Sequence, residues 1–285
     1  MKVAIASGKG GTGKTLVATN LARVASRASD VVLYDLDVEE PNCRLFLNTH
    51  DRESRPVETM LPVIDEAKCT HCGICSDLCQ FNAIVATLER VLVFPDLCHG
   101  CYGCLELCPE GAIQEGSKKI GKITVSRDES LTLVAGELEI GEPAAAVLVG
   151  RTKGFPAGGN GLRLYDSPPG TSCPVIEAVR DVDYVVLVGE PTRFGLHDLD
   201  LMVQTLRKMQ LPFGVVANKA REGNEAIEDY CRAGGIEVLL RIPWRMDIAG
   251  DTAHGRLVVE TLPDVRVLFE DLLEKLHASS KGVEA

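Results

Sequence analysis

The 285-residue sequence has no apolar run near the ~18 residues that a membrane-spanning helix needs. It also lacks an excess of positive charge, because 30 lysines and arginines face 41 aspartates and glutamates, for a net charge of −11. This balance argues against nucleic acid as a partner, since surfaces that bind DNA or RNA are basic. The chain reaches Gly8 and Lys9 too early for the apolar segment of a secretory signal. We therefore expect a cytoplasmic protein with neither a membrane nor nucleic acid as a partner.

The cysteines are unevenly distributed, since eight of the 11 lie between Cys69 and Cys108. A shift of 29 residues, from 69 to 98, carries the first four of these cysteines onto the last four. In a reducing compartment, such a density of cysteines indicates metal or redox chemistry rather than disulfide bonds. The two copies predict a small inserted module.

The rest of the chain alternates short apolar runs with amphipathic stretches, which predicts an α/β fold: a doubly wound, mostly parallel sheet with helices on both faces. Residues 1–55 and 120–285 are predicted to form this domain, and residues 56–119 the inserted module. Predicted buried strands cover residues 3–7, 31–36, 162–166, 184–188, 213–217 and 238–242; predicted helices cover 16–28, 196–209, 224–233 and 264–277. Three further stretches are less defined: strands without an assigned place in 120–140, helix or strand in 143–152, and a glycine-rich loop in 153–161.

A phosphate-binding loop follows the first predicted strand and precedes the first predicted helix, which is the context that the motif G-x-x-x-x-G-K-[ST] requires. Its glycines let backbone N–H groups turn toward phosphate oxygens, and the helix N-terminus adds partial positive charge. Lys14 is predicted to reach the β- and γ-phosphates of ATP, and Thr15 to bind Mg²⁺. The predicted nucleotide-binding residues of this loop are Gly8, Lys9, Gly10, Gly11, Thr12, Gly13, Lys14 and Thr15.

Lys9 is a second lysine, which a phosphate loop does not need for its own nucleotide. With it, residues 9–15 read K-G-G-x-G-K-[ST] and resemble the loop of the MinD/ParA group of deviant Walker-A ATPases, which includes the nitrogenase iron protein. The resemblance implies a P-loop ATPase that forms a nucleotide-dependent dimer, either with itself or with a paralogue. In such a dimer Lys9 reaches the ATP of the partner, as an arginine finger does.

The resemblance covers the whole α/β part and implies roles for residues at predicted strand ends. Asp37 would direct the attacking water, and Asp35 would support Mg²⁺ through its waters. Asp166 would hold Mg²⁺ through water, and the Gly170 N–H would sense the γ-phosphate. The implied catalytic residues are Lys9, Lys14 and Asp37.

The same resemblance implies how the base is held. Asn218 matches the asparagine that contacts adenine in the family, and Pro243 matches the segment beside the base. Asp198 matches a position that makes a cross-dimer contact in related proteins, although an aspartate in a helical stretch is also an ordinary surface residue.

Each cysteine copy has the C-x₂-C-x₂-C-x₃-C spacing of bacterial ferredoxins, which bind two [4Fe–4S] clusters and share the fourth cysteine of each run with the other cluster. Zinc fits less well, because structural zinc sites use two cysteine pairs separated by a longer loop. Cys79 precedes Gln80 where the second copy has Cys108-Pro109, so its turn and its hydrogen bonds to sulfur can differ. The predicted ligand sets are Cys69, Cys72, Cys75 and Cys108 for one cluster, and Cys98, Cys101, Cys104 and Cys79 for the other.

Three cysteines remain outside these sets. Cys43 and Cys231 are predicted to be small packed residues. Cys173 lies where the nitrogenase iron protein carries a ligand of its dimer-bridging cluster, but that protein uses two cysteines per subunit and no second candidate is present between residues 124 and 166. A packed thiol is therefore the favoured interpretation, and a metal or redox contact at a dimer face is the alternative.

Together these patterns predict an ATPase fused to a two-cluster ferredoxin module. The leading hypothesis is ATP-gated, low-potential electron delivery to a partner metalloprotein, or to its cofactor during maturation. The alternative is an iron–sulfur scaffold or carrier whose ATPase drives docking or cluster transfer. Positioning at a membrane is disfavoured, because the predicted helix 264–277 is acidic rather than basic. An ATP-dependent ligase would leave the eight cluster cysteines unexplained.

Overall fold

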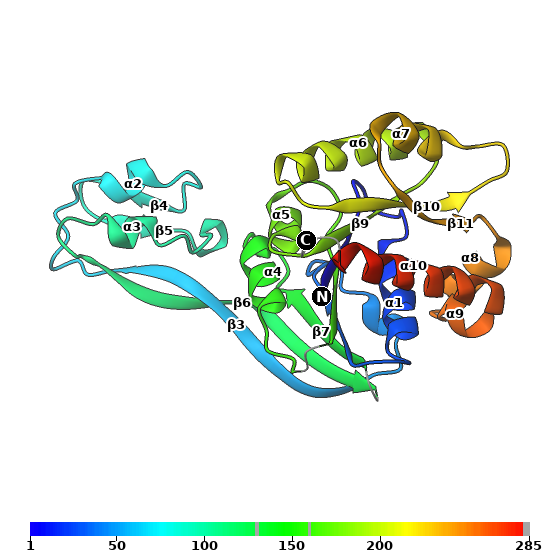
Figure 1. Ribbon diagram of the computed structural model, residues 1–285. Coiled ribbons are helices and arrows are strands. Elements are labelled where there is room, and N and C mark those ends of the chain that lie inside the picture. Colours follow the sequence, from blue (N-terminus) through cyan, green and yellow to red (C-terminus); the bar gives the residue numbers. More distant parts are fainter. Residues whose placement is uncertain (129–130, 159–160, 282–285) are drawn as a thin grey trace.

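The computed structural model describes residues 1–128, 131–158 and 161–281 (Figure 1). Its main sheet contains β1 (Lys2–Ala6), β2 (Val31–Asp35), β3 (His50–Ile64), β6 (Ile113–Asp128), β7 (Leu131–Leu138), β8 (Leu162–Asp166), β9 (Tyr184–Gly189), β10 (Phe213–Ala220) and β11 (Val238–Pro243). The strand order is β11-β10-β9-β1-β8-β2-β7-β6-β3. The strands from β11 to β7 are parallel, and β6 and β3 continue the sheet in antiparallel pairs. The predicted, mostly parallel α/β sheet is confirmed.

Helices cover both faces of the parallel part. Alternate residues of β1 show why: Val3 and Ile5 enter the core on one face, while Ala4 and Ala6 enter the core on the other. All four are fully buried, as expected for a strand covered on both sides. The first face packs α1 (Lys14–Ala25), α8 (Met246–Ala253), α9 (Val258–Thr261) and α10 (Pro263–Lys281); the second packs α4 (Ala145–Lys153), α5 (Cys173–Val179), α6 (Arg193–Lys208) and α7 (Ala226–Gly234).

The order of the strands reverses at β1. The chain runs from β1 through α1 to β2 on one side of β1, and later from β8 through α5 to β9 on its other side. In sheets of this kind, ligands bind beyond the carboxyl ends of the strands at such a reversal. The topology therefore predicts a ligand site at the loop between β1 and α1.

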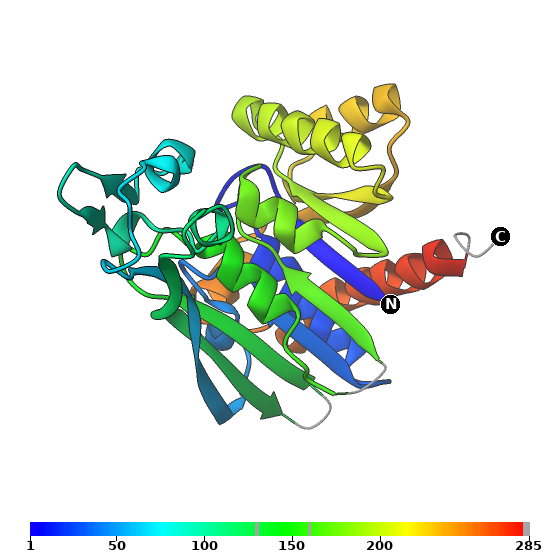
Figure 2. The same cartoon turned by 90° about the vertical axis from the view of Figure 1, so that its left-hand side faces the viewer.

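β3 and β6 continue beyond the main sheet as an antiparallel arm that carries the cysteine module (Figures 1 and 2). The module consists of α2 (Ile74–Leu78), α3 (Gly103–Glu106), one short 3₁₀ turn (Pro95–Leu97) and a hairpin of β4 (Ile84–Ala86) and β5 (Val91–Val93). Its small core is separate from the two cores of the main body. β6 pairs with β7 only from Gly121 onward. The predicted boundaries after residues 55 and 119 thus fall within β3 and β6, near the point where the arm leaves the sheet.

The less defined stretches are assigned by tertiary contacts. The strands expected in residues 120–140 belong to β6, up to Asp128, and to β7, from Leu131 to Leu138, and residues 143–152 lie mostly in α4. β3 was not predicted as a strand, so the sequence offered no partner for β6. Residues 129–130, and residues 159–160 of the predicted loop 153–161, lie outside the described residues. Within the described part of the chain, no helix has the length and apolar character needed to cross a membrane.

The arm allows a direct test of modularity. Ile64 and Ile113 are direct neighbours across the arm, so an Asn-Gly turn in place of residues 65–112 should close the hairpin. We expect the free energy of unfolding of the main body to change by less than about 1 kcal/mol, since neither main core contains a residue of that segment. Urea unfolding and ATP binding of the shortened chain measure this, and a chain that no longer unfolds cooperatively would contradict it.

Candidate functional site

The phosphate loop, which connects β1 to α1, packs against two other elements of the main body. Gly13 has a φ of +99°, in the left-handed region, and a Cβ at this position would lie 2.2 Å from Nδ2 of Asn218. A Cβ on Gly8 would lie 2.0 Å from the backbone oxygen of Asp198 in α6. Only glycine fits at these two positions, so β10 and α6 determine the path of the loop. Asp198 therefore supports the loop of its own chain through its backbone.

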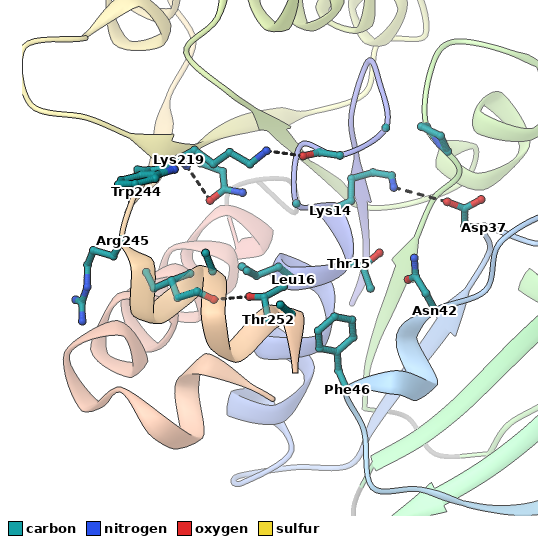
Figure 3. Close-up of a pocket in the computed structure, with 18 of the residues that line it drawn as sticks. Lys14, Thr15, Leu16, Asp37, Asn42, Phe46, Lys219, Trp244, Arg245 and Thr252 are labelled. Atoms are coloured by element: carbon teal, nitrogen blue, oxygen red, sulfur yellow. Dashed lines mark hydrogen bonds and ion pairs between the residues drawn. The ribbon is translucent and has the colours of Figure 1, made fainter. Parts of the chain in front are cut away.

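Lys14 and Thr15 begin α1 and face the carboxyl ends of β2 and β8. The Lys14 side chain is buried, and its Nζ lies 4.0 Å from Oδ2 of Asp37 (Figure 3). The Thr15 hydroxyl donates a hydrogen bond of 2.7 Å to Oδ2 of Asp166. Because neighbouring parallel strands end at the same edge of the sheet, β2 and β8 bring Asp35, Asp37 and Asp166 to one side of the loop.

Asp35, Cys43 and Asp166 form a fully buried group whose ligand atoms all lie within 4.8 Å of one another. The Cys43 N–H donates to Oδ2 of Asp35 at 2.9 Å, and the Cys43 thiol donates to Oδ2 of Asp166 at 3.4 Å. Oδ1 of Asp166 is buried and has no hydrogen-bond partner among the described residues. A buried carboxylate oxygen needs a polar partner, and these carboxylates beside Thr15 fit a hydrated Mg²⁺. Cys43, predicted only as a packed thiol, directly contacts this candidate metal site.

A cavity of 540 Å³ extends from the phosphate loop to α8 (Figure 3). This volume is typical of small-molecule sites. Lys14 and glycines of the phosphate loop stand at one end, and the side chain of Trp244 stands at the other. The sequence-predicted residues that line the cavity are Gly10, Gly11, Gly13, Lys14, Thr15, Asp37, Asn218 and Pro243.

Other predicted residues lie beside the cavity rather than in its wall: Gly8, Lys9, Thr12, Asp35, Asp166 and Gly170. The Gly170 N–H donates to the Ser7 backbone oxygen at 3.0 Å, so this bond would have to break before Gly170 could contact a phosphate. The Asn218 amide donates to the Thr12 backbone oxygen at 2.6 Å and therefore also holds the phosphate loop. Cys173 begins α5 as an exposed thiol, which corrects the favoured interpretation of a packed one.

Sequence reasoning missed part of the cavity wall. Asn42 lies five residues after Asp37, and its buried Oδ1 has no partner within the described chain. Its closeness to Asp37 in the sequence was the one feature that could have identified Asn42 as a site residue. The α8 side of the cavity had no such signal, because only the fold brings that helix to the phosphate loop. The missed lining residues include Glu40, Asn42, Phe46, Lys219, Arg245, Ile248 and Thr252.

Lys9 points to a residue of its own chain that the sequence did not single out. Its Nζ lies 2.5 Å from Oε1 of Glu190, which follows β9 directly. Lys219 pairs with the other oxygen of this carboxylate at 3.0 Å. Burial raises the pKa of Glu190, but the hydrogen bonds and charges of the two lysines lower it by more, so its pKa lies below the usual value.

The two halves of the cysteine module repeat in backbone as well as in sequence. Positions 29 residues apart share a positive φ: His71 with Gly100, Gly73 with Tyr102, and Asn82 with Gly111. The N–H groups of Ala83 and Ala112 donate to Sγ of Cys79 and Cys108, both at 3.3 Å. The hydrogen bond at Cys79 therefore matches the one at Cys108, even though Gln80 replaces proline.

Each predicted ligand set surrounds its own cavity. Cys69, Cys72, Cys75 and Cys108 line one of them, while Cys79, Cys98, Cys101 and Cys104 line the other together with Cys75. All 11 cysteines are free. In the described part of the chain, no three cysteine sulfurs lie within 4.8 Å of one another, whereas sulfurs around one tetrahedral zinc would be about 3.8 Å apart. The donor chemistry and the wide spacing fit two iron–sulfur clusters better than single metal ions.

The parallel sheet, the glycine loop at its reversal point and the lysine and threonine that begin α1 define a P-loop NTPase. The family model of the CobQ/CobB/MinD/ParA nucleotide binding domain matches residues 3–258, so the chain belongs to this family. The P-loop NTPases of the MinD/ParA type within it are ATPases.

Comparisons with individual proteins agree with this family. Two uncharacterized proteins of Methanocaldococcus jannaschii are each 31% identical to the chain; one match covers 97% of the chain and 96% of the relative, the other 77% and 80%. The iron-sulfur cluster carrier protein of the same organism is 23% identical, over 99% of the chain and 85% of the relative. Among solved structures, the septum site-determining protein MinD of Pyrococcus horikoshii with Mg-ADP is similar, with a TM-score of 0.60 and 20% identity over 96% of this chain and 95% of that one.

The buried carboxylates make stability depend on pH. Burial raises the pKa of Asp35 and Asp166, and the charge of Asp166 raises that of Asp35 further. Burial also raises the pKa of Asp37 from 3.8 to about 6, against the opposing effect of Lys14. The folded state therefore holds a proton on Asp37 that the unfolded chain releases, and this stabilisation is lost as pH rises from about 4 through about 6.

We expect the Mg²⁺- and nucleotide-free protein to lose stability between about pH 5 and about pH 7, and the Asp37→Asn variant to lose about 1 kcal/mol less, since solvent screens this partly exposed carboxylate. Urea unfolding of both proteins at the two pH values measures the difference. If the free energy of unfolding changed equally in the two proteins between these pH values, the assignment to Asp37 would be wrong.

Proposed function

We propose that this protein is a cytoplasmic, ATP-driven iron–sulfur protein that delivers low-potential electrons to a partner metalloprotein or to its cofactor during maturation. One observation carries the proposal: each of two cavities in the module is lined by one complete predicted set of four cysteines, and in each set one cysteine comes from the other copy. Such sets leave no open ligand position and interlock the two halves. This arrangement suits clusters that stay in place and carry electrons.

The nucleotide end of the proposal rests on the cavity beside the phosphate loop. The loop N–H groups and Lys14 would bind the phosphates of ATP, while Thr15, Asp35 and Asp166 would hold hydrated Mg²⁺. Asp37, next to Lys14 and in the cavity wall, would orient the attacking water. Asn218 and Pro243 line the same cavity where the base would lie.

The module residues would tune the clusters. When bound, [4Fe–4S] clusters supply one-electron transfer at potentials set by hydrogen bonds to sulfur and by burial. The matched N–H bonds to Cys79 and Cys108 would hold the two clusters in similar environments. Because β3 and β6 connect the module to the main sheet, a movement of the sheet edge would be transmitted along the arm.

ATP binding would bring together two subunits, with Lys9 of each contacting the ATP of the other. The second subunit is either another copy or a paralogue. The two similar proteins of M. jannaschii, both uncharacterized, support the second arrangement, since one organism holds two such chains.

A second candidate function is cluster transfer. It is favoured by the similarity, over nearly the whole chain, to an iron-sulfur cluster carrier protein. In that case the clusters are cargo, and ATP would drive docking or release. Labelled iron that moves from this protein to an apo-acceptor only with ATP would favour it over electron delivery.

We expect Lys9→Ala to leave ATP binding unchanged but to lower turnover by about 10³-fold or more, because the variant removes a charge that stabilises the transition state in the partner's site. Equilibrium ATP binding and phosphate release measure the two effects. Lys208→Ala, on the exposed side of α6, is the matched control. Unchanged turnover in Lys9→Ala would rule out action across a dimer.

An anaerobic redox titration with EPR, in the presence and absence of Mg-ATP, tests the coupling of the two parts. We expect Mg-ATP to lower the potential of at least one cluster or to change its spectrum, since the pairing of two ATP-bound subunits would alter the surroundings of the arm. Cys101→Ser should lose one cluster, while Cys231→Ser should keep both. If neither the potentials nor the EPR spectra of the clusters changed with Mg-ATP, this result would argue against gated electron delivery.

A further inference from the structure

Lys9 is held away from the nucleotide cavity by a carboxylate with several partners. Oε1 of Glu190 binds Lys9 at 2.5 Å and accepts a hydrogen bond from the Thr192 hydroxyl at 3.3 Å. Oε2 of Glu190 binds Lys219 at 3.0 Å. The Glu190 side chain is 13% exposed and that of Lys9 is 29% exposed. Charge-assisted bonds of this kind are stronger than bonds between neutral groups, and solvent screens them less than at the surface.

The other donors make the Lys9 contact exchangeable. Removing the single partner of a largely buried carboxylate is costly, because the charge is left uncompensated. Glu190 would keep Lys219 and Thr192 if Lys9 left it. Lys219 is itself anchored, because its Nζ also donates to the Gly11 backbone oxygen at 2.7 Å. After Lys9 leaves, each oxygen of the Glu190 carboxylate therefore still has a partner, Thr192 on Oε1 and Lys219 on Oε2.

The surrounding backbone keeps Glu190 in place. A Cβ on Gly195 would lie 2.4 Å from the backbone oxygen of Glu190, and the Gly195 N–H donates to the Thr192 hydroxyl at 3.0 Å. The same helix, α6, packs its Asp198 backbone against Gly8, the residue before Lys9. α6 therefore packs against both the Glu190 backbone and the loop that carries Lys9, so Lys9 can change partner by a movement of its side chain.

We propose that Glu190 is a positioning residue that holds Lys9 on its own chain until two ATP-loaded subunits meet, after which Lys9 exchanges Glu190 for the ATP of the partner and Lys219 keeps Glu190 neutralised. This proposal rests on the proposed function, because it needs Lys9 to act across a dimer. It adds a barrier to pairing that ATP must overcome and assigns that barrier to one carboxylate.

The first test measures the contact in the nucleotide-free protein. Acetic anhydride acylates accessible lysine amines, and mass spectrometry reports the labelling rate of Lys9 relative to the exposed Lys208. We expect Glu190→Gln to raise this rate about fivefold, because the neutral amide holds the ammonium more weakly. Glu222→Gln, in the exposed loop after β10, is the control and should not change it. An unchanged rate for Lys9 in Glu190→Gln overturns the proposal.

The second test measures ATP-dependent pairing by sedimentation with a slowly hydrolysed ATP analogue. We expect Glu190→Gln to pair at an about fivefold lower protein concentration than the unaltered chain, and to lose this advantage in the Lys9→Ala background. Pairing that is unchanged or weaker in Glu190→Gln overturns the proposal even if Lys9 labels faster. If Lys9→Ala keeps full turnover, the proposed function fails instead, and the labelling result still shows whether Glu190 holds Lys9.

Discussion

The site depends on one constraint: the parallel strands around β1 all end at the same edge of the sheet, where the strand order reverses. This single edge gathers Asp35 from β2, Asp166 from β8, Glu190 after β9 and Asn218 from β10 around one glycine loop. The loop is packed so closely that Asn218 and the α6 backbone leave no room for a side chain at Gly13 or Gly8. Backbone packing and phosphate binding thus impose the same requirement for glycine.

The second organising feature is the antiparallel extension of the sheet. β7 continues the parallel sheet beyond β2, and β6 and β3 then leave it together. A ladder that is part of the main sheet at one end and supports the module at the other is stiffer than a flexible linker, because the two strands are paired along most of their length, with a register shift after Val57. The arm therefore offers a mechanical connection between the nucleotide edge and the cysteines.

The two halves of the module are paired crosswise by symmetric backbone contacts. The backbone N–H of Asp65 donates to Ala112, and the backbone N–H of Phe94, 29 residues further on, donates to Ala83. Each copy thus begins beside the end of the other, and this crossing brings Cys79 and Cys108 into the opposite cavities. A segment this small has a limited core of its own, so ligands shared between its halves would add the missing stability.

The sequence by itself determined the features that depend on local order: the phosphate loop, the buried strands of the parallel sheet and the two cysteine runs, because spacing within a few residues specifies their geometry. The tertiary structure alone decided the partners of Lys9, the contact of Cys43 with two aspartates and the wall of the cavity at α8. These contacts join residues far apart in the chain, and their proximity follows from strand order and helix packing. The strand β3 was also identified only in the structure, because its pairing with β6, rather than its own pattern of residues, makes it a strand.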